Sequence, residues 1–278
     1  MNLALHRFDL PTRHPFTISR GTTTVQRTLV VELQQDGVCG YGEATESGYY
    51  GAGVEEMVAA LESVRPQIEA ATLVEPAEFW DAMCDALHGD AMRDAPSPAK
   101  FPLCALDVAA HDLWGKLHGA PVWKLWGLSL DDLPPSDYTI GIDSIDVMIE
   151  KLEEFPDWPV YKIKLGTPDD LQIVRRLREH TDAVFRVDAN CAWGPDETIR
   201  NAEPLRELNV EFIEQPLPPQ NRDGMQQVFR ESVLPLVADE SCQVEADVDR
   251  CGGLFHGVNV KLGKCGGLTP ARRMIARA

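Results

Sequence analysis

Hydrophobic positions in the second half of the chain form short apolar runs that alternate with longer amphipathic segments. The short runs are typical of buried parallel strands, and the longer segments repeat apolar residues at helical spacing. The expected strands are Tyr138–Ile142, Tyr161–Leu165, Val184–Asp188, Glu211–Glu214, Leu236–Asp239 and Val258–Lys261. The helices expected after them are Ser144–Phe155, Pro168–His180, Pro195–Leu208, Arg222–Glu231, Val244–Cys251 and Thr269–Ala278. This alternation predicts βα units around a parallel sheet.

The number of βα units bears on the type of sheet. Six units in series favour a closed (β/α) barrel over a doubly wound sheet. A barrel of this kind needs eight units, so the pattern predicts one that is incomplete at its C-terminus. An open barrel of six strands exposes two edges and part of its core. We therefore expect a fragment of a longer protein, with a genuinely shortened protein as the alternative.

The pattern in the first part of the chain is that of an α+β unit. The β-branched segment Arg27–Leu33 predicts a strand, and Asp36-Gly37 predicts a hairpin turn before a second strand at Val38–Ala44. Helical patterns follow at Val54–Ala70, Pro76–Leu87 and Pro102–Leu117. The sequence therefore predicts two domains, an N-terminal α+β domain over residues 1–130 and a barrel over residues 131–278.

The composition of the chain argues against several classes of partner and site. The formal net charge of −18 argues against nucleic acids and anionic membranes as partners. No apolar run approaches the roughly 18 residues of a membrane span, and the first residues do not resemble a signal peptide. Seven scattered cysteines without a C-x-x-C pair favour reduced thiols over disulfides or a zinc site. A cytoplasmic location is therefore expected.

Acidic residues stand at the ends of three successive predicted strands, as Asp188, Glu214 and Asp239. In a parallel barrel these ends meet at one mouth, where three unpaired carboxylates would repel one another. A hard divalent cation removes that conflict, and ligation by oxygen alone suits Mg²⁺, with Mn²⁺ as a substitute. The alternative is that each carboxylate caps the helix that follows it.

Three lysines flank these carboxylates. Lys162 and Lys164 share one face of their strand, and that face is expected to point inward because helices cover the outside. Lys261 ends the sixth strand, beyond the strands that carry the carboxylates. Two amines can therefore approach a bound substrate from opposite sides, which suits removal of a proton on one face and its return on the other. The alternative is a set of solvated lysines at strand ends.

Together these motifs resemble the enolase superfamily, in its muconate-lactonizing subgroup. K-I-K, D-A-N, E-Q-P, A-D-E-S and N-V-K-L-G-K-C-G-G occur in the family's order, one to a strand. G-Y-G-E-A and A-L-D-V-A-A-H-D-L-W-G-K extend the resemblance over nearly the whole chain. Y-T-I-G-I-D-S at Tyr138 is most similar to dipeptide epimerases of small or hydrophobic dipeptides. The resemblance implies an enolase-like capping domain and a modified TIM barrel.

The resemblance also implies the role of each site residue. One Mg²⁺ per subunit would be bound by Asp188, Glu214 and Asp239, and Lys164 and Lys261 would be the paired acid and base. The other implied positions are Lys162 and Thr139 for substrate, Asn190 and Glu240 as supporting groups, and loops near Ser19–Thr22 and Tyr49–Tyr50 for specificity. The implied reaction is epimerisation of a dipeptide through an enediolate. Members of the family often associate, so a homo-oligomer is left open.

Two other functions remain open at this point. One is another reaction of the subgroup with the same ligands and lysines, namely muconate cycloisomerisation, o-succinylbenzoate synthesis or N-acylamino acid racemisation. Dipeptide epimerases of the family carry Asp-x-Asp on the last strand, and no such pair follows Cys265 here. The other is a non-catalytic remnant that binds only a metal or a partner.

Overall fold

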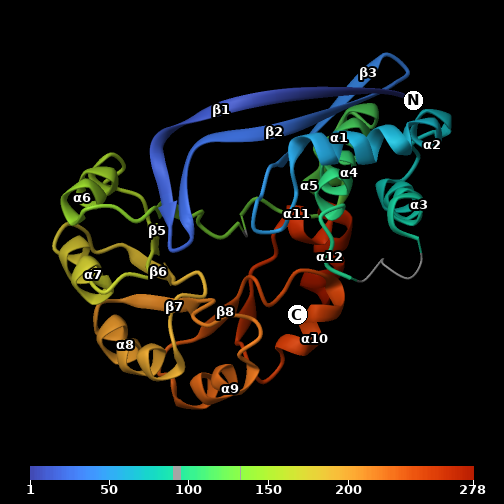
Figure 1. Cartoon of the computed structure of the whole chain (residues 1–278). Helices are drawn as coiled ribbons and strands as arrows, with labels where there is room; N and C mark the ends of the chain where they lie inside the picture. Colours follow the sequence, from blue (N-terminus) through green and yellow to red (C-terminus); the bar gives the residue numbers. More distant parts are fainter. Residues whose placement is uncertain (90–94, 132) are drawn as a thin grey trace.

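The computed structural model describes residues 1–89, 95–131 and 133–278 and contains two sheets (Figure 1). One is an antiparallel sheet of three strands in the order β1–β2–β3, and the other is a parallel sheet of six strands in the order β4 to β9. A separate cluster of buried side chains accompanies each sheet. The six-stranded parallel sheet with its outer helices confirms the predicted (β/α) barrel architecture.

The antiparallel sheet is built from β1 (Asn2–Ile18), β2 (Gly21–Gln35) and β3 (Val38–Thr45). Asp36 and Gly37 have φ angles of 52° and 79°, as the predicted hairpin turn between β2 and β3 requires. The sequence pattern did not predict β1. This strand is largely exposed, so it lacks the apolar alternation that a half-buried strand shows.

In its described residues the N-terminal part also contains the helices α1 (Val54–Ser63), α2 (Arg65–Ala70), α3 (Pro76–His88), α4 (Lys100–Leu117) and α5 (Val122–Leu125). The prediction of one helix over Val54–Ala70 is wrong in one respect, because the helix breaks at Val64. Pro66 lies in the first turn of α2 and has no N–H to continue a helix from α1.

Helix α4 lies directly on β3 because β3 offers glycines at the contact. A Cβ at Gly42 would come within 2.0 Å of the Ala105 carbonyl oxygen, and one at Gly40 within 2.4 Å of the Ala109 carbonyl oxygen. The G-Y-G segment is therefore explained by close packing of a strand on a helix backbone.

The strands of the parallel sheet are β4 (Tyr138–Ile140), β5 (Val160–Lys164), β6 (Val184–Asp188), β7 (Val210–Glu214), β8 (Leu236–Ala238) and β9 (Gly257–Val258). The helices after them are α6 (Ile145–Glu153), α7 (Asp170–Arg178), α8 (Pro195–Glu207), α9 (Arg222–Glu231), α10 (Glu245–Cys251), α11 (Leu262–Cys265) and α12 (Leu268–Arg277). Every predicted βα unit is thus confirmed. No helix in the described part of the chain has the length and apolar character needed to cross a bilayer.

The prediction for the last strand needs correction. β9 ends at Val258, and Lys261 lies beyond it as the N-cap residue of the short helix α11. Among the described residues, β9 is an end strand paired with β8 alone, so hydrogen bonding to one neighbour supports a shorter strand than the apolar run suggests.

The N-terminal part contacts the barrel at several points, from the β1–β2 hairpin and from helices α3 and α4. The tip of the β1–β2 hairpin reaches the ends of the barrel strands (Figure 1), where the Ile142 N–H donates to the Thr17 carbonyl at 2.8 Å. On the other side, the carboxylate of Asp107 on α4 accepts from the N–H and the hydroxyl of Thr269 on α12, both at 2.8 Å. These contacts fix the barrel mouth relative to the first sheet.

Candidate active site

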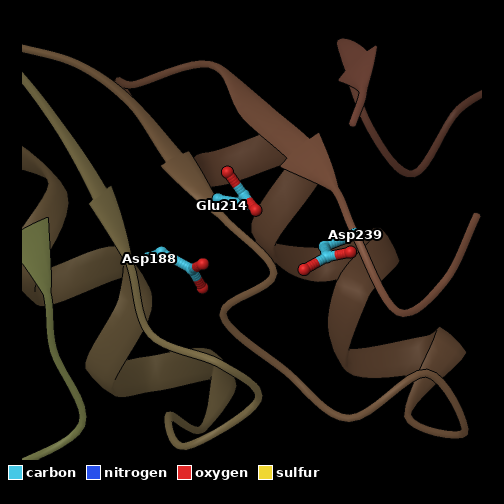
Figure 2. Close-up of side chains that lie close together, drawn as sticks. All are labelled: Asp188, Glu214 and Asp239. Atoms are coloured by element: carbon cyan, nitrogen blue, oxygen red, sulfur yellow. The ribbon is translucent and has the colours of Figure 1, made fainter. Parts of the chain in front are cut away.

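Three buried carboxylates converge at the ends of neighbouring strands (Figure 2). Asp188 and Glu214 are the last residues of β6 and β7 and are paired in register, and Asp239 follows directly after β8. Carboxylate oxygens of the three residues lie within 4.8 Å of one another. The parallel sheet therefore brings together the three acidic residues predicted from the sequence.

The carboxylate cluster fits a hard divalent cation. Burial and the nearby charge of Asp188 raise the pKa of Glu214 above its ordinary value, so the cluster holds three negative charges only with difficulty. Burial also opposes ionisation of Asp188 and Asp239, but neighbouring lysines overcome it and lower both pKa values. Oxygen donors without histidine or cysteine suit Mg²⁺. These three side chains could therefore hold such an ion.

Two lysines of β5 enter the cluster from one side. The Lys162 ammonium lies 2.6 and 2.7 Å from the two oxygens of Glu214 and 3.1 Å from Asp188 Oδ2. The Lys164 ammonium donates to Asp188 Oδ2 at 2.6 Å. Burial disfavours a charged Lys162, but Asp188 and Glu214 outweigh that effect and raise its pKa. Both lysines point inward, as the alternation along the strand predicted.

Lys261 reaches the cluster from the other side. Its ammonium forms an ion pair with Asp239 Oδ2, and its side chain is 42% exposed, whereas that of Lys164 is 9% exposed. Lys164 belongs to β5 and Lys261 follows β9, with the three carboxylate-bearing strands between them. The two amines therefore flank the carboxylates from opposite ends of the row.

Sequence reasoning missed two further residues of this cluster. The Asn259 side-chain amide donates to Glu214 Oε1 at 2.8 Å, and the buried Lys264 ammonium donates to Asp239 Oδ1 at 2.6 Å. Both stand in the segment after β9, within the motif N-V-K-L-G-K-C-G-G. The available signal was a second lysine three residues after Lys261, which is one turn further along if the segment is helical.

The cluster opens into a cavity of about 780 Å³ between the barrel mouth and the N-terminal part. Lys164, Asn190, Glu240, Lys261 and Lys264 line it from the barrel, together with Arg20, Tyr49 and Tyr50 from the loops expected to shape specificity. The aromatic and aliphatic part of the wall also includes Phe16, Ile18 and Phe101. The cavity therefore combines charged groups on its floor with apolar side chains above them.

The hairpin tip is fastened over this mouth by Arg20. Its guanidinium donates to Glu240 Oε1 at 2.6 Å and to the Asn190 carbonyl at 2.8 Å, and it stacks 4.3 Å above the centre of the Tyr49 ring. The Asn190 N–H in turn donates to Asp188 Oδ1 at 2.9 Å. Asn190 and Glu240, predicted as supporting groups, thus connect the carboxylate cluster to the N-terminal hairpin.

Thr139, which the resemblance predicts to contact substrate, lies on β4. It is in register with Lys162 on the neighbouring strand, but it lines a second cavity of about 240 Å³ with Thr12, His14 and Lys151. Phe16 lines both cavities, and the contact of Thr139 with substrate stays a prediction.

Comparison with known proteins agrees with this geometry. Residues 4–127 match the N-terminal domain model of mandelate racemase and muconate lactonizing enzyme, and residues 148–278 match the enolase C-terminal domain-like model. An L-Ala-D/L-amino acid epimerase of Flavobacterium johnsoniae is 49% identical over 278 residues, which is all of this chain and 80% of the relative. The chain belongs to the mandelate racemase and muconate lactonizing enzyme family. The resemblance inferred from the motifs is confirmed.

Two further proteins place the chain within this family. A second L-Ala-D/L-amino acid epimerase, from a Maribacter strain, is 47% identical over all of this chain and 79% of the relative. Among solved structures, a dipeptide epimerase of Enterococcus faecalis in complex with Mg and L-Leu-L-Tyr is 26% identical. It superposes with a TM-score of 0.87 over 98% of this chain and 77% of that structure. Because these two relatives are named as epimerases, the prediction of an isomerase is confirmed.

Proposed function

We propose that this chain is a dipeptide epimerase that depends on one Mg²⁺, or Mn²⁺ in its place, and inverts a carbon next to a carboxylate. The observation that carries the proposal is the position of two lysines, Lys164 and Lys261, on opposite sides of three buried carboxylates. The names of the L-Ala-D/L-amino acid epimerases support a dipeptide as the substrate.

The three lysines would have different roles in the transfer of the α-proton. The substrate carboxylate would lie over the cluster near Lys162, whose buried ammonium stabilises the negative charge that builds on it as the α-proton leaves. Lys164 and Lys261 would then face the two sides of the reacting carbon, one taking the proton and the other donating one, so that the stereocentre inverts. A divalent cation held by Asp188, Glu214 and Asp239 would supply further positive charge at that carboxylate.

The side chains of the dipeptide would lie in the upper part of the cavity. Phe16, Ile18 and Tyr50 offer apolar contacts there, whereas the guanidinium of Arg20 is already bound to Glu240. This wall favours small or hydrophobic residues over acidic ones, because an acidic side chain would have to compete with a buried carboxylate for Arg20.

The test uses Lys164→Ala and Lys261→Ala with L-Ala-L-Xaa and L-Ala-D-Xaa dipeptides and Mg²⁺ in deuterated water. Each variant should lose epimerisation by a factor of at least about 10². Each should keep exchange of the α-proton from only one of the two diastereomers, because one lysine remains on one face. Lys116→Ala removes an exposed lysine on α4 and is the matched control.

Two results would contradict the proposal in different ways. Turnover of either variant at the wild-type rate would exclude paired lysine bases. Absence of exchange in the wild-type chain, over a panel of dipeptides with Mg²⁺, would favour the non-catalytic alternative.

We also propose the division into domains 1–130 and 131–278. Two separate clusters of buried side chains support it, one with Leu29, Leu61 and Leu113 and one with Ile163, Val187 and Ile213.

A further inference from the structure

Lys264 is a buried lysine outside the set that moves the proton. Its residue exposure is 3%, and its ammonium donates to Asp239 Oδ1 and to the Asp239 carbonyl oxygen, both at 2.6 Å. A third acceptor, the Asn259 carbonyl oxygen, lies at 3.3 Å. A lysine ammonium has three N–H donors, so these three oxygens account for all of them.

These contacts give the two oxygens of Asp239 different surroundings. Oδ1 is bound to Lys264, whose side chain is 2% exposed at the edge of the cavity, whereas Oδ2 faces Lys261, whose side chain is 42% exposed there. Because Lys264 also binds the backbone carbonyl of Asp239, it fixes both the main chain and the carboxylate of that residue. The carboxylate is therefore held with one oxygen fixed and the other directed toward the cluster.

The local backbone explains how Lys264 reaches this position. The short helix α11 ends at Cys265, and Gly266 and Gly267 follow with φ angles of 99° and 124°, which favour glycine. The Trp80 indole N–H donates to the Gly266 carbonyl at 2.7 Å. The turn that carries Lys264 is thus anchored to the N-terminal part of the chain.

We propose that Lys264 is a positioning residue of the cation site, acting through Asp239. The proposal rests on the proposed function, because it assigns Asp239 as a ligand. Burying an ammonium is unfavourable unless it is paired and hydrogen-bonded, and an apolar side chain of similar length would fill the same space without that requirement. The gain from a lysine here is a fixed orientation of Asp239, as outer partners of metal ligands provide in other sites.

The alternative role of Lys264 makes the opposite prediction. A lysine that merely places positive charge near the site would repel a cation, so its removal would tighten cation binding. If the lysine instead orients a metal ligand, its removal would weaken cation binding. The direction of the change therefore separates the two roles.

The experiment measures Mn²⁺ binding without substrate, from the electron paramagnetic resonance signal of free Mn²⁺ during titration. Lys264→Met should raise the dissociation constant by about 10- to 100-fold. Lys264→Gln, which keeps a side-chain N–H donor, should raise it less and serves as the second variant if the first unfolds. Lys116→Met is the control and should bind Mn²⁺ as the wild-type chain does. Thermal melting without metal checks that each variant is folded.

The possible results separate this proposal from the proposed function. A folded Lys264→Met chain that binds Mn²⁺ as tightly as the wild-type chain, or more tightly, would overturn the positioning role. A wild-type chain that binds no Mn²⁺ would overturn both proposals. Weakened binding in the variant, in a wild-type chain without proton exchange, would support the positioning role and refute the epimerase.

Discussion

Asp107→Ala tests whether the N-terminal part stabilises the end of the barrel. Asp107 is 1% exposed, and its carboxylate lies at the start of helix α12, where the Thr269 N–H and hydroxyl each donate to it at 2.8 Å. The first N–H groups of a helix have no partner within the helix, so this carboxylate from α4 caps α12.

The expected loss follows from the groups left without partners. An unsatisfied buried donor costs about 1–3 kcal/mol, and loss of a helix cap costs about 0.5–2 kcal/mol. The two terms share the Thr269 N–H, so they are not additive, and we expect the free energy of unfolding to fall by about 1–4 kcal/mol. Thr269→Val removes only the hydroxyl and should cost about 1 kcal/mol.

The assay is urea denaturation followed by circular dichroism, with Asp146→Ala as an exposed control in the first turn of α6. Once Asp107 is replaced, Thr269→Val should have little further effect, because the hydroxyl has already lost its acceptor. A loss below about 0.5 kcal/mol for Asp107→Ala, similar to that of a surface substitution, would refute the reasoning. Full additivity of the two substitutions would also contradict it.

Three further outcomes are expected. Gly267→Ala should destabilise the chain by at least about 1–3 kcal/mol in urea unfolding, because φ is 124° there and a Cβ would come within 2.4 Å of Asp107 Oδ2. Arg20→Met should lower the melting temperature because it leaves the buried carboxylate of Glu240 without its ion-pair partner. Adding Glu240→Gln to that variant should restore part of the lost melting temperature. Burial raises the pKa of Asp143, but its hydrogen bond to Lys151 outweighs burial, so the pKa lies below its ordinary value of 3.8. The ionised carboxylate therefore stabilises the fold above pH 3.8, and this stabilisation is lost as the pH falls through the lowered pKa. Asp143→Asn should therefore cost about 0.5 kcal/mol at pH 7, and the difference from wild type in urea unfolding should shrink below pH 4.

The barrel strands were predictable from sequence because they are short segments, most of them largely apolar, that alternate regularly with longer amphipathic segments. Val184–Asp188 matches β6 without change, although Arg186 interrupts its apolar run, because Phe185 and Val187 are buried and Asp188 ends the strand. The strand β1 gave no such signal, because exposure of most of its side chains removes the constraint on its sequence. β1 is held in place by its antiparallel pairing with β2, and the sequence pattern of β1 alone does not reveal that pairing.

Some residues of the candidate site were predictable from the sequence and others were not. Asp188 and Glu214 could be placed in advance because parallel strands end at one edge of a sheet, which fixes the position of any residue at a strand end. Lys264 could not be placed so, because its position depends on a turn formed by two glycines and a hydrogen bond to Trp80 from another part of the chain. Sequence periodicity therefore predicts the groups that regular elements carry into a site, whereas the groups that orient them come from irregular segments fixed by tertiary contacts.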